Sequence, residues 1–264
     1  MKKYLVIGKP INHSLSPKLH NFWIKQHNIN ANYDKKEINE ENIKEIFLEI
    51  KKGNLDGINI TVPFKKSVIT FLDDLSLEAK KTQSVNTVYK DKNNKIIGHN
   101  TDIAGFELGF KHINFEIKNK KVFMFGAGGV APSIIFALKK MGVNQIFLSN
   151  RTKKKAEDLK KIYPELKVIE WGKYSDADVI INATSIGLNK NEELKIDYKN
   201  IGSNKLFYDV IYNPVETKFL LEAKKFGNKT ENGKMMFIYQ AHQAFLIWHK
   251  IMPTINNETI KLLD

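Results

Sequence analysis

The segment NITVPFKK, residues 59–66, ends an apolar run with polar side chains that could bind a small molecule. Asn59 and Thr61 lie two residues apart, so on an extended chain both side chains point to the same side. Pro63 ends the predicted strand and turns the chain, so that Lys65 can present its ammonium group beside the same polar face. The alternate positions, expected on the other face or in the core, are Ile58, Ile60 and Val62. The segment is therefore either a turn with a spare lysine or one wall of a substrate site.

Other polar side chains in the N-terminal part of the chain also follow predicted strands. The segment GKPINHSLSPKLHN, residues 8–21, brings the hydroxyls of Ser14 and Ser16 to a helix N-terminus, a place that suits a carboxylate. Asn86 lies in the segment SVNT and joins this polar set. Taken alone, Ser16 followed by Pro17 could be only a helix cap with a proline at the first helical position. We expect no metal centre, because the sequence has no HExxH pattern, no Cys/His cluster and no grouped carboxylates.

A glycine-rich segment, GAGG at Gly126–Gly129, follows one predicted strand and opens a predicted helix. Glycines permit a tight turn and let backbone N–H groups approach a pyrophosphate that lies on the helix N-terminus. Ala131 occupies the third glycine position of the dinucleotide fingerprint, which the fingerprint allows, and Pro132 falls in the first helical turn, where its missing N–H costs little. The strand and helix around the segment favour a dinucleotide site over a simple turn.

Arg151 is the only arginine among the 42 basic residues of the chain. It lies in SNRTKKKA, residues 149–156, at the end of the next predicted strand, where the choice between NAD and NADP is commonly made. An acidic residue there would accept a hydrogen bond from the ribose of NAD, but the segment has no carboxylate. Arginine can pair with a 2'-phosphate in a bidentate way and lie flat on adenine, and lysine can do neither. The segment favours NADP, and the alternative is an incidental cation at the start of a helix.

Hydride transfer to a ketone leaves an oxygen that must be protonated, so a site for this chemistry needs a proton donor within hydrogen-bond reach. Asp102 follows a predicted strand of the same unit as Lys65, so the two could converge at the carboxyl ends of one parallel sheet. We hypothesise that Lys65 is general acid in reduction and base in oxidation, and that Asp102 orients it. Taken singly, Lys65 could be a solvated lysine at the start of a helix, and Asp102 could be a helix cap. His13 and His20 flank the serine segment as alternative proton donors, but the pair makes them unnecessary.

Composition limits the kind of protein. The chain has 264 residues, 42% of them hydrophobic, and no cysteine. It has no apolar run long enough to span a bilayer and no signal-peptide pattern, so we expect a cytoplasmic protein without membrane contact. The net charge is +13, but the lysines are scattered as pairs such as Lys51–Lys52 and Lys160–Lys161. This pattern indicates a lysine-rich composition, so we expect no binding of nucleic acid.

The hydrophobic period alternates between strand-like and helix-like segments, which predicts an α/β fold. In the first unit we expect strands at 4–8, 31–38 and 57–62, a hairpin across 84–100, and helices at 16–27, 43–50, 65–72 and 101–110. In the second unit we expect strands at 121–129, 145–150, 166–171, 178–184 and 205–211, and helices at 130–142, 153–163 and 217–227. The last segment, 233–252, is predicted to be a long apolar helix that packs back on the first unit.

This alternation is typical of parallel sheets that are covered on both faces. We expect two α/β domains. Residues 1–102 with 238–264 form the predicted substrate-binding catalytic domain, and residues 103–237 form a Rossmann-type NADP-binding domain.

The order of motifs along nearly the whole chain resembles the shikimate dehydrogenase family. The N-terminal motifs are GKPINHSLSPKLHN, NITVPFK, SVNT and NTD, and the later ones are GAGG, NRT, NATS, YDVIY and GKMMFIYQA. Any one of them is weak, but so many in the family's order are highly specific. The resemblance implies reversible, NADP-dependent reduction of 3-dehydroshikimate to shikimate, in the route to aromatic amino acids.

The resemblance also implies roles for individual residues. Ser14 and Ser16, assisted by Tyr212, would hold the substrate carboxylate. The residues that would bind the ring hydroxyls or lie beside them are Asn59, Thr61, Asn86, Asp102 and Gln240. The catalytic pair would be Lys65 and Asp102. The residues that match the family's NADP site are Gly126, Ala127, Gly128, Gly129, Val130, Asn150, Arg151, Thr152, Lys155, Val210 and Gly233.

Departures from the family pattern are modest. Val130 and Pro132 alter the helix start in the dinucleotide loop, and Lys155 stands where an arginine is common, which bears on NADP affinity more than on the reaction.

A non-catalytic NADP-sensing relative would be expected to lose Lys65 or Asp102. A quinate dehydrogenase acts on a substrate that differs from shikimate by one ring hydroxyl. An acidic residue near position 151 would favour such an enzyme, with NAD as its coenzyme. A folate-linked dehydrogenase would leave SLSP and NITVPFK unexplained. The expected partners are the small-molecule substrate and, at most, a second copy in a homodimer.

Overall fold

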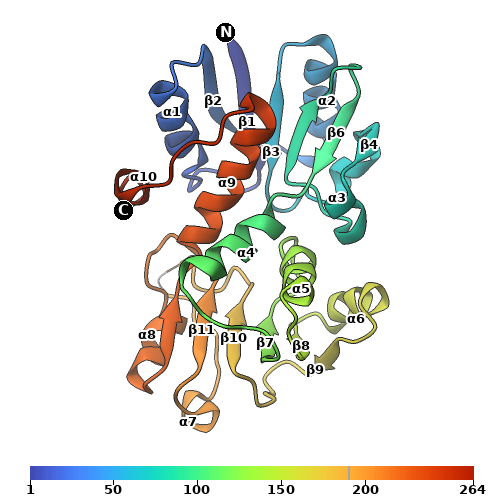
Figure 1. Cartoon of the computed structure of the whole chain (residues 1–264). Helices are drawn as coiled ribbons and strands as arrows, with labels where there is room; N and C mark the ends of the chain where they lie inside the picture. Colours follow the sequence, from blue (N-terminus) through green and yellow to red (C-terminus); the bar gives the residue numbers. More distant parts are fainter. Residues whose placement is uncertain (190) are drawn as a thin grey trace. The chain divides into compact units, whose positions relative to one another are not determined.

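The computed structural model describes residues 1–189 and 191–264. The chain divides into two compact units. Unit 1 comprises Met1–Gly105 with Ile238–Asp264, and unit 2 comprises Phe106–Phe237. Each unit is an α/β structure built around its own six-stranded sheet (Figure 1). The predicted first boundary lies at residue 102, and the structure places it after Gly105, within helix α4 (Asp102–His112).

Unit 1 alternates strands with helices or 3-10 turns as far as β5, which forms a hairpin with β6, and it ends with the C-terminal helices. Its strands are β1 (Lys2–Gly8), β2 (Ala31–Glu37), β3 (Gly57–Ile60), β4 (Asp74–Leu75), β5 (Thr87–Lys90) and β6 (Ile96–His99). Its helices are α1 (Ser16–Gln26), α2 (Ile43–Lys52), α3 (Leu77–Thr82) and α10 (Asn257–Lys261), with short 3-10 turns at Glu40–Asn42 and Ser67–Phe71. Helix α9 (Lys234–His249) begins in unit 2 and continues into unit 1.

The sheet of unit 1 is mixed, with the strand order β2-β1-β3-β5-β6-β4. The predicted all-parallel sheet is therefore wrong for this unit, because the predicted hairpin inserts β5 between β3 and β6. Both β3 and β6 pair antiparallel with β5, so they run in the same direction. Their carboxyl ends consequently reach the same edge of the sheet, which is the arrangement that the placement of Lys65 and Asp102 requires.

Both faces of this sheet are covered (Figure 1). The core on one face combines the apolar side of α2 with alternate residues of β3, namely Ile43, Ile46, Phe47, Ile50, Ile58 and Ile60. On the other face α1 and α9 pack together, with the rings of Trp23 and Phe245 5.6 Å apart. Trp248 of α9 donates a hydrogen bond from its indole nitrogen to the Val88 carbonyl of β5, at 3.1 Å. This contact supports the prediction that the last helix packs back on unit 1.

Two local predictions for unit 1 are wrong. Residues 65–72 were expected to be an α-helix, but they form a 3-10 turn at Ser67–Phe71, because three successive β-branched residues disfavour a regular helix there. Ser16 does not cap α1. Leu15 is the N-cap residue, and the hydroxyl oxygen of Ser14 accepts a hydrogen bond from the Ser16 backbone N–H, at 3.3 Å.

Unit 2 is a doubly wound α/β structure. Its strands are β7 (Lys121–Phe125), β8 (Gln145–Ser149), β9 (Lys167–Ile169), β10 (Val179–Asn182), β11 (Leu206–Asp209) and β12 (Lys229–Glu231). Its helices are α5 (Ala131–Lys140), α6 (Lys153–Ile162), α7 (Tyr198–Ile201) and α8 (Lys218–Lys225). All strand pairs are parallel, in the order β12-β11-β10-β7-β8-β9. Read from β9, this is the strand order 3-2-1-4-5-6 of Rossmann folds.

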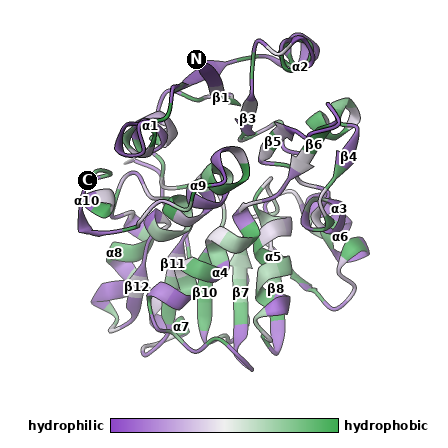
Figure 2. Cartoon of the chain, turned by 45° about the horizontal axis from the view of Figure 1, so that its top comes forward, coloured by the Kyte–Doolittle hydropathy of each residue, from purple (hydrophilic) through white to green (hydrophobic). Residues whose placement is uncertain are grey.

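The central strands of unit 2 are apolar because both faces of the sheet are buried. Figure 2 shows β7 and β10 as mainly hydrophobic. One face packs against α8 through Phe207 and Phe219, whose rings lie 5.2 Å apart. The other face is covered by α4, where the ring of Phe110 stacks 5.0 Å from Tyr208. The strand order reverses between β7 and β10, which is the position where open α/β sheets bind ligands.

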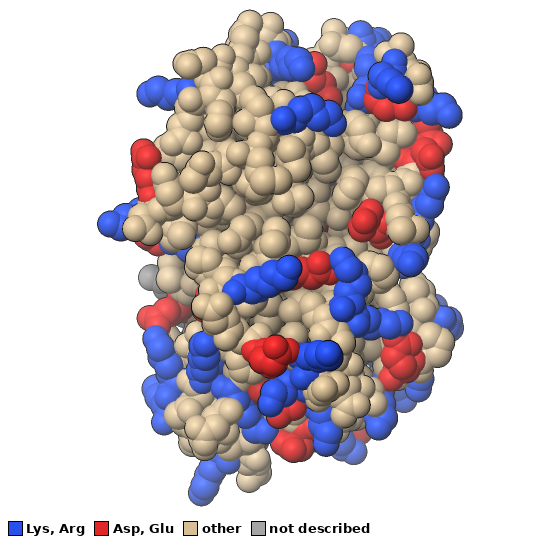
Figure 3. Space-filling view, viewed as in Figure 1, with Lys and Arg blue, Asp and Glu red and all other residues tan. Residues whose placement is uncertain are grey.

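On the face shown in Figure 3, the lysines spread over the surface with acidic residues among them and form no single stripe. Within the described part of the chain, no helix is long and apolar enough to cross a membrane.

Candidate active site

The buried ion pair of Lys65 and Asp102 is the centre of the polar site in unit 1. The Lys65 ammonium donates a hydrogen bond to Asp102 Oδ2 at 2.6 Å. Lys65 is 8% exposed and Asp102 is 5% exposed. A charge at such a position is costly unless a partner of opposite charge compensates it, so the two groups offset each other's cost of burial. The convergence that the sequence analysis proposed for these two residues is present at the shared edge of β3 and β6.

Asn86 fixes the orientation of the Asp102 carboxylate. Its side-chain amide donates to Asp102 Oδ1 at 2.8 Å and to the Thr101 hydroxyl oxygen at 3.0 Å. Its Oδ1 accepts from the Thr101 backbone N–H at 2.8 Å. One carboxylate oxygen of Asp102 therefore faces Lys65 and the other faces Asn86, which leaves the carboxylate little freedom to rotate.

Asn100 helps to fix the same carboxylate by binding the backbone of Asp102. Its Oδ1 accepts from the Asp102 backbone N–H at 3.1 Å, at the first residue of α4. Its amide donates to the Thr82 hydroxyl oxygen at 3.0 Å and to the Ser84 carbonyl at 2.9 Å. The sequence motif NTD contains Asn100 but did not indicate this bracing role, because it depends on α3, a helix that the sequence analysis missed.

Asn59 and Thr61 lie where the period-two pattern placed them. Asn59 pairs with Val6 of β1 on the face covered by α1 and α9, opposite to the core that contains Ile58 and Ile60. The expected burial of Val62 is wrong. Its side chain is 44% exposed because β3 ends at Ile60 and the chain turns.

The amide of Asn59 is held by groups of unit 1. Its Nδ2 donates to the Asn86 carbonyl and to the Thr87 hydroxyl oxygen, both at 2.9 Å. Its Oδ1 accepts from the Tyr33 hydroxyl at 2.6 Å. Both amide hydrogens are thus engaged within the protein, so Asn59 presents only its carbonyl oxygen to a ligand. Tyr33 was not found by motif reasoning, because its place opposite Asn59 depends on how β2 pairs with β1.

The serine segment is joined to the NITVPFKK segment by the backbone. The Lys9 N–H donates to the Val62 carbonyl at 3.0 Å, and a side chain at Gly8 would collide with Thr61. Ser16 is buried and Ser14 is half-buried at the start of α1. The two segments that the sequence analysis treated separately therefore border one another in unit 1.

The two histidines near the serines lie in different environments. His13 is exposed. His20 is 1% exposed and stacks on Tyr33 with ring centroids 4.2 Å apart. Burial, with a smaller contribution from nearby His249, lowers the pKa of His20 to about 3. His20 is consequently neutral at physiological pH and supports Tyr33 as an aromatic core residue.

Two further predicted substrate residues lie on or beside α9. Gln240 is half-buried on the part of α9 that belongs to unit 1. Tyr212 follows β11 in unit 2, where its ring stacks on Phe237 with centroids 4.2 Å apart. Among the described residues, no three His, Asp or Glu side chains gather in a way that could hold a metal ion.

In unit 2, the glycine loop follows β7 at the point where the strand order reverses. Gly126 has a φ of 107°, and a Cβ there would lie 2.6 Å from the Ala183 carbonyl oxygen. Gly128 is exposed, and a Cβ there would meet nothing within 4 Å. The Ala127 N–H donates to Asn150 Oδ1 at 3.0 Å, which ties this loop to the end of β8. Gly126 is thus required by the fold, whereas Gly128 leaves open space where a pyrophosphate could approach.

We expect Gly126→Ala to lower the free energy of unfolding by about 2 kcal/mol, because alanine rarely adopts this φ and its methyl group would strike Ala183. Gly128→Ala should leave the unfolding midpoint unchanged but weaken NADPH binding. Urea denaturation and calorimetric titration with NADPH would measure the two effects. Equal stability loss in both variants would contradict the division of roles.

The predicted NADP residues after β8 and β11 are placed for a ligand. Arg151 is exposed and has no hydrogen bond or ion pair with any residue that the structure describes, so its guanidinium is available to an anion. The Asn150 amide donates to the Thr152 carbonyl at 2.8 Å, which shapes this turn, and Lys155 is exposed on the first turn of α6. Val210 and Gly233 are in direct contact, because a side chain at Gly233 would collide with the Val210 carbonyl.

Family models match both units of the chain. Residues 6–88 match the shikimate dehydrogenase substrate binding domain, and residues 107–214 match the model described as shikimate / quinate 5-dehydrogenase. The chain belongs to the shikimate dehydrogenase family. The resemblance read from the sequence motifs is confirmed.

Known relatives match this chain over its whole length. A shikimate dehydrogenase (NADP(+)) of Pelagibacter ubique is 58% identical over 263 residues, which cover 100% of this chain and 99% of the relative. A crystal structure of shikimate dehydrogenase from Aquifex aeolicus is 37% identical, with a TM-score of 0.90 and coverage of 100% and 97%. The enzyme from Thermus thermophilus in complex with NADP(H) and shikimate is 28% identical, with a TM-score of 0.90 and coverage of 100% and 98%.

This shikimate dehydrogenase family member also has a buried carboxylate beside the glycine loop that the sequence analysis did not single out. Asp209, at the end of β11, is fully buried. Its carboxylate accepts hydrogen bonds from the Thr217 hydroxyl at 2.6 Å, the Ile211 N–H at 3.0 Å and the Asn182 amide at 3.1 and 3.2 Å. Asn182 in turn accepts from Thr184, so Asp209 braces the loop that packs on Gly126.

Burial raises the pKa of Asp209 to about 6, and the hydrogen bonds from Thr217, Ile211 and Asn182 offset only part of this rise. Because the folded-state pKa lies above the ordinary value, the stabilising contribution is complete below about pH 4 and is lost as the pH rises through about 6. We expect the free energy of unfolding of the native chain, relative to Asp209→Asn, to fall by roughly 3 kcal/mol over that interval. Urea denaturation of both proteins between pH 4 and pH 8 measures it; a difference that stays constant or grows contradicts the assignment.

Proposed function

We propose that the chain catalyses the reversible, NADPH-dependent reduction of 3-dehydroshikimate to shikimate, in the route to aromatic amino acids. The observation that carries this proposal is the buried pair of Lys65 and Asp102, held by Asn86 at the edge of the sheet in unit 1. Membership in the shikimate dehydrogenase family supports it.

Lys65 carries out the proton transfer. The coenzyme, when bound, would supply the hydride as NADPH in reduction and accept it as NADP(+) in oxidation. In the direction of reduction, the Lys65 ammonium donates a proton to the oxygen that becomes the hydroxyl of the product, and in oxidation the neutral amine takes that proton back. Asp102 holds the ammonium at 2.6 Å and accepts from a hydroxyl of the substrate. Because the pair is buried, water competes poorly for these hydrogen bonds.

The remaining polar residues bind the substrate. Ser14 and Ser16 lie at the start of α1, where backbone N–H groups favour an anion, and they hold the substrate carboxylate with the help of Tyr212. Those that bind the ring hydroxyls, or lie beside them, are Asn59, Thr61, Asn86 and Gln240. Asn59 contributes through its carbonyl oxygen, since Asn86 and Thr87 already receive both of its amide hydrogens.

Unit 2 binds NADP. The glycine loop approaches the pyrophosphate, and Arg151 pairs with the 2'-phosphate. The residues assigned to this site are Gly126, Ala127, Gly128, Gly129, Val130, Asn150, Arg151, Thr152, Lys155, Val210 and Gly233. Their fit to a dinucleotide is supported by the open space at Gly128 and by the available guanidinium of Arg151.

A spectrophotometric assay of the reduced nicotinamide tests the function. It pairs shikimate or quinate with NADP or NAD, which gives four combinations. We expect turnover to be fastest with shikimate and NADP. No turnover in any combination would exclude the enzyme, and a preference for quinate with NAD would replace shikimate by the other substrate that the family model's description names.

We further propose that the enzyme works in the cytoplasm as a monomer or homodimer. The absence of cysteine fits a reducing compartment. Light scattering coupled to size-exclusion chromatography would distinguish one copy from two, and any larger assembly would contradict this part of the proposal.

A further inference from the structure

Asp209 is a buried carboxylate that the proposed reaction does not use. It is the last residue of β11, next to β10, at which the strand order of unit 2 reverses. Its side chain is 0% exposed. Any effect of Asp209 on a bound coenzyme must therefore act through the residues that it holds.

The carboxylate of Asp209 joins two loops of unit 2. The Thr217 hydroxyl donates to Oδ2 at 2.6 Å and the Ile211 N–H donates to Oδ1 at 3.0 Å, both from the loop after β11. The Asn182 amide donates to both oxygens, at 3.1 and 3.2 Å, and also to the Ile186 carbonyl at 3.1 Å, in the loop after β10. All of these partners donate to Asp209, so they match the ionised carboxylate, which only accepts.

These two loops border residues assigned to the NADP site. A Cβ at Gly126 would lie 2.6 Å from the Ala183 carbonyl oxygen, so the glycine loop rests on the loop after β10. Val210 directly follows Asp209, and a side chain at Gly233 would collide with the Val210 carbonyl. Because these groups are in close contact, a loosening of either loop would displace residues that are proposed to contact the coenzyme.

Thr217 completes the contacts of Asp209 in place of a helix cap. It is the N-cap residue of α8, where a threonine oxygen usually accepts a hydrogen bond from a backbone N–H of the first turn. Among the described residues, its side chain accepts no such bond. Its buried hydroxyl donates to Asp209 instead. The contact with the carboxylate is thus made without the usual side-chain stabilisation of α8.

Within the described part of the chain, Asp209 has no ion-pair partner. The phenols of Tyr198 and Tyr208 interact with it, and burial raises the pKa of both, so they are neutral at physiological pH. Other titratable side chains on the loop after β11, α8, β12, α7 and the unit 2 part of α4 are Tyr212, Glu216, Lys218, Glu222, Lys224, Lys225, Lys229, Glu231, Lys199, Glu107, Lys111 and His112. The charge of Asp209 is therefore compensated by hydrogen bonds alone.

The ionised form of Asp209 is unfavourable in the folded chain at neutral pH. Burial raises the pKa of Asp209 to about 6, and the hydrogen bonds from Thr217, Ile211 and Asn182 oppose this rise. A buried carboxylate of this kind lowers stability above its pKa. Such a cost is typical of groups that serve a binding site.

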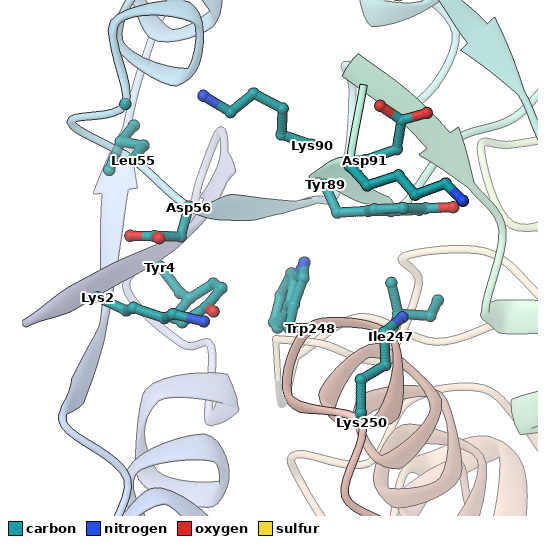
Figure 4. Close-up of a pocket in the computed structure, with 12 residues that line it drawn as sticks. Lys2, Tyr4, Leu55, Asp56, Tyr89, Lys90, Asp91, Ile247, Trp248 and Lys250 are labelled. Atoms are coloured by element: carbon teal, nitrogen blue, oxygen red, sulfur yellow. The ribbon is translucent and has the colours of Figure 1, made fainter. Parts of the chain in front are cut away.

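Carboxylates that brace backbone groups elsewhere in the chain are less buried. Asp56 accepts from the Lys3 N–H at 2.9 Å and lines a pocket of about 420 Å³ in unit 1 (Figure 4). Asp178 accepts from the Lys121 N–H at 2.8 Å, at the start of β10. Both side chains are half-buried. Bracing of the backbone does not by itself require the full burial of Asp209.

We propose that the ionised carboxylate of Asp209 is a positioning group for NADP, which holds the loops after β10 and β11 in the arrangement that the coenzyme binds. The inference rests on the proposed assignment of Gly126, Val210 and Gly233 to the NADP site. A proton on Asp209 places an O–H group among other donors, so at least one contact is lost and the loops loosen. NADP consequently binds the ionised form more tightly, and by linkage its binding releases protons from the protonated form.

Isothermal titration calorimetry of the full chain with NADP tests the proposal. Asp209→Asn keeps the size of the side chain without its charge. The NADP affinity of the native chain should exceed that of this variant by about tenfold at pH 7.5, a typical coupling between linked sites, and should approach it at pH 5. The 2'-phosphate of NADP titrates in the same range, but it contributes equally to both proteins, so the comparison removes it.

Two buffers with different ionisation enthalpies give the number of protons released at pH 6. We expect NADP binding to release more protons from the native chain than from Asp209→Asn. The matched control is Asp178→Asn, which removes a backbone-bracing carboxylate from the other edge of the same sheet and should change neither the affinity nor the proton count. Thr217→Val removes one donor to the carboxylate, so the pH at which NADP affinity falls should move upward. This second variant tests the proposal even if Asp209→Asn does not fold.

Three results would overturn the proposal: an affinity ratio that stays constant from pH 5 to pH 8, no loss of affinity in Asp209→Asn at pH 7.5, or equal losses in Asp209→Asn and Asp178→Asn. The first of these would leave Asp209 a role in the fold alone. If the native chain bound no NADP at any pH, the proposed coenzyme site would itself be refuted, and this inference with it. The two failures are therefore distinguishable.

Discussion

Lys65→Ala is expected to lower the turnover number by about 10³-fold, because it removes the proposed proton donor, while shikimate still binds. Steady-state kinetics and calorimetric titration with shikimate measure the two quantities. Normal turnover in Lys65→Ala would exclude Lys65 as the general acid. Loss of both turnover and binding would assign Lys65 to substrate binding instead of proton transfer.

The matched control is the neighbouring lysine, since Lys66 is exposed and Lys66→Ala should have normal kinetics. Stability needs its own control. Removing Lys65 leaves the buried Asp102 carboxylate without its cation, which is expected to cost about 3 kcal/mol. Lys65→Ala combined with Asp102→Asn removes this unpaired charge, so the double variant should regain stability without regaining turnover.

The second large effect is expected at the coenzyme site. Arg151→Gln should lower kcat/KM for NADPH by about a hundredfold and leave kcat/KM for NADH nearly unchanged, because the guanidinium is proposed to contact only the 2'-phosphate. Kinetics with both coenzymes at a fixed concentration of 3-dehydroshikimate measure the ratio. Equal losses with NADPH and NADH would show that Arg151 acts on a part that both coenzymes share.

Two further variants test whether the effect is specific to Arg151 and to its guanidinium group. Lys154→Gln removes a positive charge from the first turn of α6, three residues after Arg151. Lys154 is exposed, and this variant should change the coenzyme ratio little. Arg151→Lys keeps the charge but loses the planar, bidentate group. If Arg151→Lys behaves like the native enzyme, charge alone explains the preference for NADPH, and the planar shape of the guanidinium plays no part.

The Rossmann-type unit was predictable because its signals are local. Each buried parallel strand is a continuous apolar run, and each long helix has its own period. The order of elements from β7 to α8 therefore follows from the sequence, except for the four-residue helix α7, which was not predicted. The strands missed were short or at an edge, such as β4 and β12, where few side chains are buried and the pattern is weak. The mixed sheet of unit 1 was missed because a hairpin and a parallel crossover are both compatible with the same alternation of elements.

The candidate site was only partly predictable. The sequence motifs identified Lys65, Asp102 and Asn86, because polar and charged residues that directly follow strands are candidates for substrate binding and proton transfer. The motifs did not identify Tyr33, which reaches Asn59 across two strand pairings. They also did not identify Asp209, which is indistinguishable in sequence from the last residue of any strand. Hydrogen-bond partners far apart along the chain leave no periodic signal, so residues that only hold others in place escape motif reasoning.

By itself, the sequence determined the α/β class, the two-unit organisation, the family, and the residue types available for proton transfer and for a 2'-phosphate. Those properties depend on local period and on short motifs. The tertiary structure alone decided that β5 runs between β3 and β6, so that Lys65 and Asp102 meet at one edge and form a bond of 2.6 Å. The physical reason is strand register, which brings together residues that are distant in sequence.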